Sequence, residues 1–503
     1  MIKKVLIANR GEIAVRVMRS CREMGLRTVA VFSEADRASR HVMYADEAYC
    51  IGPAESRESY LNIDKIINVA LQCKADAVHP GYGFLSENAE FVRRCEAAGL
   101  VFIGPRAETM EAMGDKISAR KRMIGAGVPV VPGTTEPLKN ADEALRICNE
   151  IGYPVMLKAS MGGGGKGMRL IHSAEEVKEA YDAARSESMS SFGDDTVYLE
   201  KFVEEPHHIE FQILGDEYGN VVHLYDRECS VQRRNQKIVE ESPSPFLTPE
   251  LRREMGAKAV AAAKAVNYRG AGTIEFLVDK YRNFYFLEMN TRLQVEHPIT
   301  EEVLGVDLVK EQLRVANGEK LRFRQEDLFQ RGHAIECRIC AEDTENGFIP
   351  CPGVIRQLTE PNGIGVRIDS YVYEGYEIPL YYDPMIGKLI VWATTRQFAI
   401  ERMRRVLYEF KITGLKTNLN YLRRIMYAPA FVKGEYDTSF LEKYSRSLQR
   451  TNGDNEEIEN MALIAAYVDY LFNLEENSPV RVADARPISR WREFGLQKGV
   501  LRI

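Results

Sequence analysis

The sequence predicts a multidomain protein that starts as an α/β fold and continues as an α+β fold. Residues 1 to about 114 alternate apolar runs with amphipathic helical stretches, whereas later segments contain strands that follow one another directly. A chain of 503 residues is also too long for a single hydrophobic core. Charged residues make up 28% of the chain, and no stretch of the ~18 uncharged apolar residues that a membrane span needs occurs, so we expect a soluble protein.

The first domain, residues 1–114, has the rhythm of a parallel sheet with crossover helices. The apolar runs VLIA, TVAVFS and ADAVHPG alternate with helical patterns over residues 12–24 and 63–72. The expected fold is Rossmann-like. Its first strand-to-helix turn, NRGE at residues 9–12, lacks the three glycines that let a backbone approach a pyrophosphate, so we do not expect a dinucleotide site.

Three segments follow this domain. We expect a central domain over residues 115–331 with a lid subdomain at about 134–203, a mixed α+β domain over 332–446, and a helical and basic tail over 447–503. The elements expected along them are helices over 116–126 and 141–151, a strand over 154–159, strand-rich sequence over 169–290 interrupted by a helix over 250–266, and helices over 398–409 and 458–474.

The composition limits the partners and the compartment. A net charge of −6 argues against a nucleic-acid surface along the whole chain, because such a surface needs clustered Lys and Arg. The N-terminus has only a short apolar run before Asn9, so it lacks a signal-peptide core and we expect the cytoplasm. The one close cysteine pair, Cys337 and Cys340, has no second pair or histidine cluster at zinc-ligand spacing.

A pair of facing carboxylates is the first candidate site. The segment GTIEFLVDKYRNFYFLEMN predicts two strands joined by a polar turn, and with Tyr281 and Arg282 at the centre of the turn Glu275 lies opposite Glu288. Two carboxylates across a ladder repel each other, and the local sequence supplies no Lys or Arg to neutralise them. A magnesium ion between them is the simplest remedy, and a solvated surface pair is the alternative.

The residues after this pair add further chemistry. EMNTRLQVE places Glu288, Asn290, Arg292, Gln294 and Glu296 at a spacing of two, so an extended strand would point all five side chains the same way. Arg292 is suited to hold a carboxylate-shaped anion with two hydrogen bonds, and Glu296 to remove a proton from that anion. We interpret the segment as a catalytic strand.

A glycine run is the second candidate. The sequence ASMGGGGKG lies between the strands PVMLKA and MRLIHS, and Lys166 is followed by glycine, so the P-loop pattern fails. Glycines inside a hairpin suit a mobile lid whose backbone amides close over phosphates, with Lys158 and Lys116 as charge partners. A flexible linker is the alternative.

Other polar residues stay open between a binding role and an ordinary surface or turn. The strand YLEKFV could present backbone groups to an adenine edge, and a charged loop after it could line an anion pocket. The open positions are His207, His208, Gln232, Lys237, Arg338 and Tyr82.

Taken together, ANRGEIA, HPGYGFLSEN, KASMGGGGKGM, EMNTRLQVEHPITE and ECRICAED resemble the biotin carboxylase family of the ATP-grasp fold, over about residues 1–446. The resemblance implies an ATP-grasp central domain with a mobile glycine-rich lid. It implies a magnesium or manganese ion held by Glu275, Glu288 and Asn290. It also implies an ATP site formed by Lys116, Lys158, Gly162, Gly163, Gly164, Gly165, Glu200, Lys201, Val203, His208 and Gln232.

The same resemblance implies how the reaction proceeds. Glu296 would deprotonate bicarbonate for attack on the γ-phosphate, and the carboxyphosphate formed would give carbon dioxide to the ureido nitrogen of biotin. Arg338 would stabilise the biotin enolate. The residues implied to bind bicarbonate or biotin are Lys237, Arg292, Gln294, the Val295 amide, Glu296, Arg338, Tyr82 and Gly83.

One residue departs from the family pattern. Asn235 stands in RRNQK where the family commonly has a histidine. An asparagine can donate or accept a hydrogen bond but cannot carry charge, so a phosphate contact at this position would be weaker or reorganised.

The expected partners follow from what the sequence does not contain. No Met-Lys-Met biotinylation sequence occurs, so we expect a separate biotin carboxyl carrier protein and a carboxyltransferase subunit for acetyl-CoA, propionyl-CoA or pyruvate. A homodimer is the family expectation, and the tail is expected to dock on a partner. Two alternatives stay open. Another ATP-grasp ligase gives no reason for Arg338 and the EMNTRLQVEHPITE string together, and Asn235 favours a non-catalytic nucleotide-binding subunit that only regulates assembly.

Overall fold

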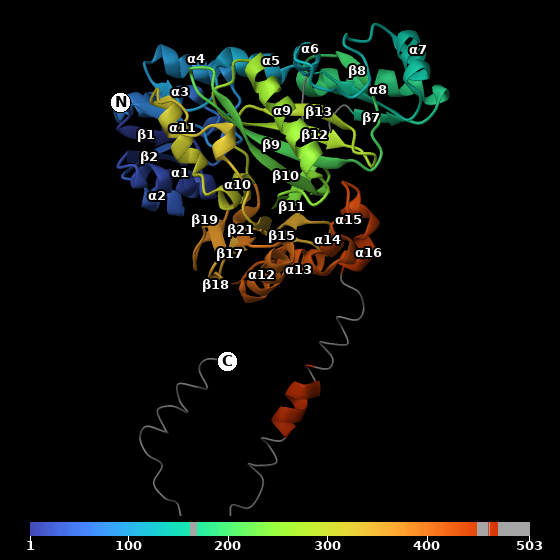
Figure 1. Cartoon of the computed structure of the whole chain (residues 1–503). Coiled ribbons are helices and arrows are strands. Elements are labelled where there is room, and N and C mark those ends of the chain that lie inside the picture. The colour runs from blue at the N-terminus through green and yellow to red at the C-terminus, as the bar shows by residue number, and fades with distance from the viewer. Residues whose placement is uncertain (161–167, 450–460, 462, 471–503) are drawn as a thin grey trace, which may run out of the picture. The chain divides into compact units, whose positions relative to one another are not determined.

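The computed structural model describes residues 1–160, 168–449, 461 and 463–470. Its contacts separate one compact unit, Met1–Gln449, from a second, Arg450–Ile503. The first unit is coloured from blue to orange-red in Figure 1 and holds every site candidate that the structure describes. No helix within the described ranges is both long enough and apolar enough to cross a membrane.

The first domain contains the parallel sheet that the sequence predicts. Five strands pair in the order β3-β2-β1-β4-β5, and all of their pairings are parallel. The neighbours Val5 and Leu6 enter different hydrophobic cores, because successive side chains of a strand point to opposite faces. The elements are β1 Lys4–Ile7, α1 Gly11–Glu23, β2 Arg27–Ser33, α2 Arg40–Tyr44, β3 Glu47–Gly52, α3 Ile63–Gln72, β4 Ala77–His79, α4 Ala89–Ala97, β5 Val101–Phe102 and α5 Ala107–Gly114.

An antiparallel sheet of eight strands forms the centre of the unit, in the order β13-β12-β9-β10-β11-β14-β21-β19. The expected domain boundary between residues 331 and 332 therefore falls between strands of one sheet. The sheet strands are β9 His207–Gly215, β10 Val221–Arg233, β11 Gln236–Ser242, β12 Gly270–Val278, β13 Phe284–Asn290, β14 His333–Cys340, β19 Val366–Ser370 and β21 Met385–Ala393. The helices beside them before residue 331 are α6 Lys116–Gly125, α9 Pro249–Ala265, α10 His297–Leu304 and α11 Leu308–Ala316.

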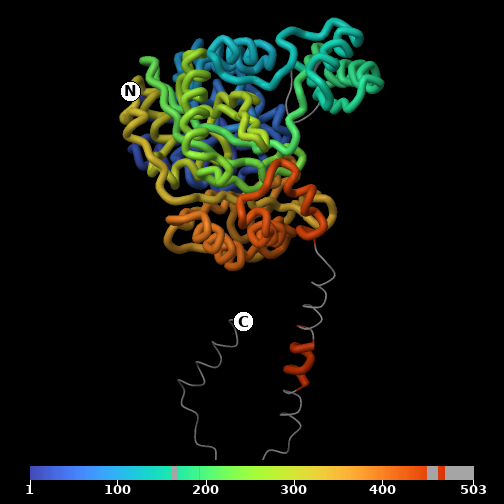
Figure 2. Tube along the Cα trace, turned by 45° about the vertical axis from the view of Figure 1, so that its right-hand side comes forward, coloured from blue at the N-terminus to red at the C-terminus, as the bar shows by residue number. Residues whose placement is uncertain are grey.

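The lid subdomain is a small layer with its own core, visible beside the main body in Figure 2. Strands β7-β6-β8 form its sheet, and β6 and β7 make the hairpin that the sequence predicts around the glycine run. The glycines themselves, residues 162–165, lie outside the described residues. The subdomain consists of α7 Ala141–Ile151, β6 Val155–Ala159, β7 Met168–Ile171, α8 Val177–Phe192 and β8 Val197–Lys201.

Helix α8 corrects the sequence analysis, which read residues 169–290 as strands with one helix over 250–266. Val177, Tyr181 and Ala184 of α8 are buried at helical spacing in the lid core. The apolar face of α8 is narrow and the rest of the segment is polar, so the helical periodicity is weak and the segment resembles a loop. The expected helix over 250–266 is present as α9.

The remaining elements pack below the large sheet, as Figure 1 shows for α12 and α13. They are β15 Glu342–Asp343, β16 Ile349–Pro350, β17 Gly353–Val354, β18 Gln357–Thr359, β20 Glu377–Ile378, α12 Arg396–Glu409, β22 Lys411–Thr413, α13 Leu419–Tyr427, α14 Pro429–Lys433, α15 Phe440–Lys443 and α16 Ser445–Leu448. The helix expected over 458–474 falls mostly outside the described residues, of which 461 and 463–470 are helical.

Candidate active site

A cavity of about 1010 Å³ opens within the first unit. Its walls include side chains from the parallel-sheet domain, the lid sheet and the eight-stranded sheet. The predicted site residues that line it are Tyr82, Gly83, Lys116, Lys158, Glu200, Lys201, Val203, His208, Gln232, Lys237, Glu275, Glu288, Asn290, Arg292, Gln294, Val295 and Arg338. Glu296 is fully buried beside this lining and forms ion pairs with Lys237 and Arg338.

The β12–β13 hairpin places Glu275 opposite Glu288, as predicted. The predicted turn centre is wrong by half a residue, because Val278 pairs with Phe284 rather than with Tyr285. A β-bulge between the turn and Glu275 shifts the register back by one residue. Two local errors in the expectation therefore cancel at the carboxylate pair.

Lys237 supplies the neutralising cation that the local sequence lacks. Its Nζ lies 3.0 Å from Glu275, 2.7 Å from Glu210 and 2.6 Å from Glu296. Burial would lower the pKa of this ammonium, but the three carboxylates raise it well above its usual value. The expectation of an unneutralised pair is thus wrong for Glu275, because strand β11 brings in a lysine that is distant in the sequence.

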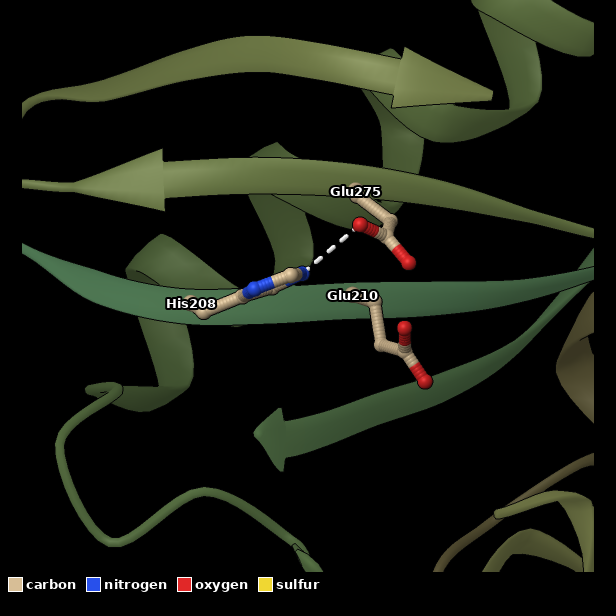
Figure 3. Close-up of side chains that lie close together, drawn as sticks. All are labelled: His208, Glu210 and Glu275. Carbon is tan, nitrogen blue, oxygen red and sulfur yellow. Dashed lines mark ion pairs between the residues drawn. The ribbon is translucent and has the colours of Figure 1, made fainter. Parts of the chain in front are cut away.

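His208 adds a second contact to the same carboxylate, as Figure 3 shows. His208 and Glu210 lie on β9, and Glu275 lies on the neighbouring strand β12; the His208 Nε2 is 2.8 Å from a Glu275 oxygen. Burial alone would raise the pKa of Glu275, but Lys237 and His208 outweigh it and lower that pKa. Burial would likewise lower the pKa of His208, and the charge of Glu275 raises it instead.

Glu288 is the partner that fits a divalent cation. Among the described residues no donor forms a hydrogen bond or ion pair with its carboxylate, whereas the Asn290 amide donates to Glu275 at 2.9 Å. Burial and then the charge of Glu275 raise the pKa of Glu288. A half-buried carboxylate with free lone pairs, a second carboxylate across the ladder and an amide oxygen nearby match the oxygen ligands that magnesium prefers.

The segment after Asn290 is a loop, which corrects the interpretation of residues 288–296 as one strand. Strand β13 ends at Asn290, and Glu296 occupies the N-cap position of helix α10. The polar side chains still converge: the Arg292 guanidinium donates to Gln294 at 3.0 Å and to Asn290 at 3.2 Å. Their meeting therefore depends on the loop's path and not on a spacing of two.

Glu296 is charged at neutral pH. Burial would raise the pKa of its carboxyl, but Lys237, Arg338 and Arg227 hold that pKa well below its usual range. The Lys237 ammonium donates to one oxygen at 2.6 Å, and the Arg338 guanidinium donates to the other at 3.0 Å. A buried, ionised carboxylate at the edge of a cavity is suited to accept a proton from a bound acid.

One end of the cavity combines an apolar slot with lysines. Met156, Leu277 and Leu287 line it, and Lys158 lies 2.5 Å from Glu200. The Lys201 side chain points away from this slot, because its ammonium donates to the Gly152 and Tyr153 carbonyls at 2.9 and 2.8 Å. Lys201 therefore offers the cavity its backbone.

Asn235 lies in the two-residue turn between β10 and β11. Arg233 pairs with Gln236, and the φ angles of Arg234 and Asn235 are 49° and 64°. Asparagine tolerates this left-handed conformation better than most residues do. The departure from the family histidine therefore fits the turn's backbone.

Several site residues escaped the sequence analysis because their partners are distant in the chain. Arg227 is fully buried and donates to Glu210 at 2.5 Å, Arg120 donates to Glu200 at 3.0 Å, and Glu240 accepts from Arg338 at 2.6 Å. Only Glu210 left a signal, since it follows His208 at a spacing of two in HHIEFQ.

Comparisons with known proteins agree along most of the chain. Residues 1–110 match "Biotin carboxylase, N-terminal domain", residues 115–324 match "Carbamoyl-phosphate synthase L chain, ATP binding domain", and residues 336–443 match "Biotin carboxylase C-terminal domain". A pyruvate carboxylase subunit of Methanothermobacter thermautotrophicus is 56% identical over 448 residues, which cover 89% of this chain and 91% of that protein. Biotin carboxylase 1 of Bacillus subtilis is 53% identical, with 88% and 99% covered.

A solved structure is similar over the same part of the chain. The biotin carboxylase domain of Hydrogenobacter thermophilus 2-oxoglutarate carboxylase, crystallised as a dimer with MgADP, ADP and bicarbonate, superposes with a TM-score of 0.86. It is 50% identical and covers 90% of this chain and 99% of its own.

The first prediction concerns the cation shared by the buried carboxylates. In metal-free protein, Lys237→Met should lower the free energy of unfolding near neutral pH by about 3–5 kcal/mol, because the carboxylates lose their partner. Their pKa values in the folded variant should rise above those of the unfolded chain. The folded form then binds more protons, so stability should increase as pH falls from about 8 to about 6. Urea midpoints across this range measure the effect.

The matched control is Lys443→Met, which removes a half-exposed lysine that pairs with Glu205 and Asp437. Its stability should follow the pH dependence of the parent protein. A Lys237→Met variant whose stability also runs parallel to the parent's would contradict the shared-cation interpretation.

Proposed function

The chain belongs to the biotin carboxylase family, and from that premise we propose how its residues perform the reaction. The enzyme is an ATP-dependent carboxylase that uses magnesium and bicarbonate to carboxylate biotin. The observation that carries the residue assignment is the position of Glu296: an ionised, buried base between Lys237 and Arg338, next to the loop of Arg292 and Gln294.

The nucleotide is proposed to lie along the lid side of the cavity. The apolar residues Met156, Leu277 and Leu287 give a slot for a flat purine, and the backbone of residues 201–203 borders it. The Lys201 and Phe202 amides donate to the Pro132 and Pro154 carbonyls, so the Val203 amide is proposed as the donor to the adenine edge. Lys116, Lys158, His208 and Gln232 are proposed to face the phosphates, with the backbone amides of Gly162 to Gly165 closing over them.

Magnesium is proposed to be held by Glu275, Glu288 and Asn290. When bound, it would neutralise part of the negative charge on the phosphate oxygens. The chain's own part is to keep Glu288 free of other partners, and the His208 and Lys237 contacts to Glu275 fix the orientation of the second carboxylate.

Bicarbonate is proposed to bind against Lys237, Arg292, Gln294 and the Val295 amide. Glu296 accepts its proton, a carbonate oxygen forms a bond to the γ-phosphorus, and the bond from that phosphorus to ADP breaks. The carboxyphosphate formed then splits into carbon dioxide and phosphate. The phosphate takes the proton of the biotin ureido nitrogen, which bonds to the carbon dioxide while Arg338 stabilises the enolate oxygen. Tyr82 and Gly83 are proposed to lie near the biotin ring.

The assembly is proposed to contain other chains. We propose a homodimer that works with a separate biotin carboxyl carrier protein and a carboxyltransferase subunit for acetyl-CoA, propionyl-CoA or pyruvate. The relatives named as biotin carboxylase and as a pyruvate carboxylase subunit support this kind of division. The cytoplasm is the proposed compartment, because all nine cysteines are free thiols.

The comparisons do not favour either alternative function. Another ATP-grasp ligase would match only the central part, whereas the matches on both sides of it are to biotin carboxylase domains. The argument for a non-catalytic role was the asparagine at position 235. Asn235 has a positive φ angle in its turn, which asparagine tolerates, so the backbone conformation explains this residue without a loss of catalysis. Bicarbonate-dependent ATP cleavage stimulated by free biotin tests the proposed function directly, and no cleavage would overturn it.

Glu296→Gln should reduce bicarbonate-dependent ATP cleavage by about 10²–10⁴-fold, because the amide cannot accept the bicarbonate proton. ATP binding, measured by calorimetry, should stay within about twofold, since Glu296 lies outside the nucleotide slot. Glu302→Gln on the same helix is the matched control, as its carboxylate contacts only Arg367 among the described residues. Normal turnover by Glu296→Gln would remove this residue from the role of base.

Glu288→Lys should abolish turnover at every magnesium concentration, because it puts an ammonium into the proposed metal site. A magnesium titration of ATP cleavage measures this, with the exposed Glu326→Lys as a control for charge reversal. A Glu288→Lys variant with the parent's magnesium dependence would contradict the site. Chelation of magnesium from the parent enzyme should stop turnover reversibly.

The tail is proposed to dock on a partner protein. We place the truncation after Gln449, because Leu448 is buried in the C-terminal core. Removal of residues 450–503 should leave the turnover of free biotin within about twofold, since every described lining residue precedes residue 450. Complex formation with the partner chains, followed by copurification, should be lost. Unchanged assembly by the truncated protein would rule out docking through the tail.

A further inference from the structure

Lys388, in the middle of strand β21, is a fully buried lysine that no step of the proposed reaction uses. Its ammonium donates to the Val295 carbonyl at 3.0 Å and lies 3.2 Å from a Glu12 oxygen and 3.9 Å from Asp369. A buried lysine is rare unless it is paired, and this one is held by groups from three different parts of the chain.

Two of the three partners of Lys388 lead to different substrate groups. The Val295 carbonyl belongs to the peptide that joins Val295, proposed to bind bicarbonate, to Glu296, the proposed base. Glu12, near the N-terminus of α1, accepts a hydrogen bond from the Tyr82 hydroxyl, and Tyr82 is proposed to lie near biotin. The Lys388 ammonium also lies 5.9 Å from the centre of the Tyr82 ring.

The sheet places Lys388 next to Arg338, the arginine proposed to stabilise the enolate, but Lys388 itself does not reach the cavity. Lys388 is the direct cross-strand neighbour of Arg338 in the β14–β21 ladder, so the two side chains leave the same face. Arg338 lines the cavity and Lys388 does not. Two like charges on a directly opposed pair repel each other, so this placement needs the compensation that Glu12 and Asp369 provide on one side and Glu240 on the other.

We propose that Lys388 is a positioning residue for the carboxylation reaction. It fixes the peptide between Val295 and Glu296 and, through Glu12, the hydroxyl of Tyr82, so that bicarbonate and biotin are held in register across the domain junction. This inference rests on the proposed function. It explains why a cation is buried at this point: one ammonium, with its hydrogens directed by a carbonyl and a carboxylate, orients two loops at once.

Loss of this ammonium should have a specific kinetic effect. In Lys388→Met the Val295 carbonyl loses a charge-assisted hydrogen bond, so the KM for bicarbonate should rise by roughly tenfold or more. The KM for ATP should stay within about twofold, because the nucleotide slot lies on other strands. The amount of ATP cleaved per biotin carboxylated should increase, because carbon dioxide forms next to a biotin that is no longer held in place.

Two further variants separate positioning from a general loss of stability. Arg396→Met is the matched control, since Arg396 also bridges a buried glutamate, Glu241, and a backbone carbonyl, that of Phe431, but lies outside the cavity lining. It should lower thermal stability without changing the ratio of the two KM values. The double variant Lys388→Met with Glu12→Gln also removes the carboxylate nearest to Lys388, so it should fold even if the single variant does not, yet it should keep the bicarbonate defect.

The measurement is steady-state kinetics with free biotin, with ATP cleavage and carboxybiotin counted in the same reaction. A selective rise in the bicarbonate KM together with poorer coupling supports the positioning role. An equal fall in all parameters, or a double variant with the parent's bicarbonate KM, overturns it. A parent enzyme that shows no bicarbonate-dependent cleavage would instead contradict the proposed function itself, so the two failures are distinguishable.

Discussion

The burial of several like charges around one ammonium is the constraint on which the rest of this structure depends. Glu210, Glu275 and Glu296 all contact Lys237 within 3.0 Å and are all buried. A carboxylate removed from water is destabilised by several kcal/mol unless it is paired, so this cluster is stable only when β9, β11, β12 and the loop before α10 have come together. The network that forms the site is therefore also part of what holds the central sheet in register.

The same network separates the properties of chemically identical groups. Burial raises the pKa of Glu210 to about 7 despite Arg227, whereas Lys237 and Arg338 outweigh burial at Glu296 and hold its pKa well below the usual range. Glu288, whose strongest neighbour is another carboxylate, has a raised pKa. One carboxylate is thus kept ready to accept a proton, and another has its charge uncompensated until a cation arrives. When the pKa values of titratable groups in one site are shifted in opposite directions, these groups usually have different roles as acid, base or metal ligand.

The sequence predicted the parts of the site that are set by local pairing or by a glycine-flanked hairpin. It predicted the facing of Glu275 and Glu288, although a β-bulge had to correct the turn, and it predicted the β6–β7 hairpin and the parallel sheet. It missed helix α8, whose apolar face is narrow. It also missed the cation beside Glu275, because Lys237 reaches it from β11, which lies beyond β9 and β10 in the sheet order. Counting charges in the neighbouring sequence cannot identify an ion-pair partner that comes close only in the folded protein.

The end of strand β13 at Asn290 shows why the spacing of polar residues predicted the right residues through a wrong geometry. In an extended strand, side chains at a spacing of two stand in a row about 7 Å apart, too far apart to share one small anion. The chain instead turns after Asn290, Arg292 reaches back to Asn290 and across to Gln294, and Glu296 occupies the N-cap position of α10. Because residues 291–296 form a loop and not a strand, their polar groups lie close together around one concave surface. It also leaves the peptide between Val295 and Glu296 without a strand neighbour, and the ammonium of Lys388 takes the place of one by donating to the Val295 carbonyl.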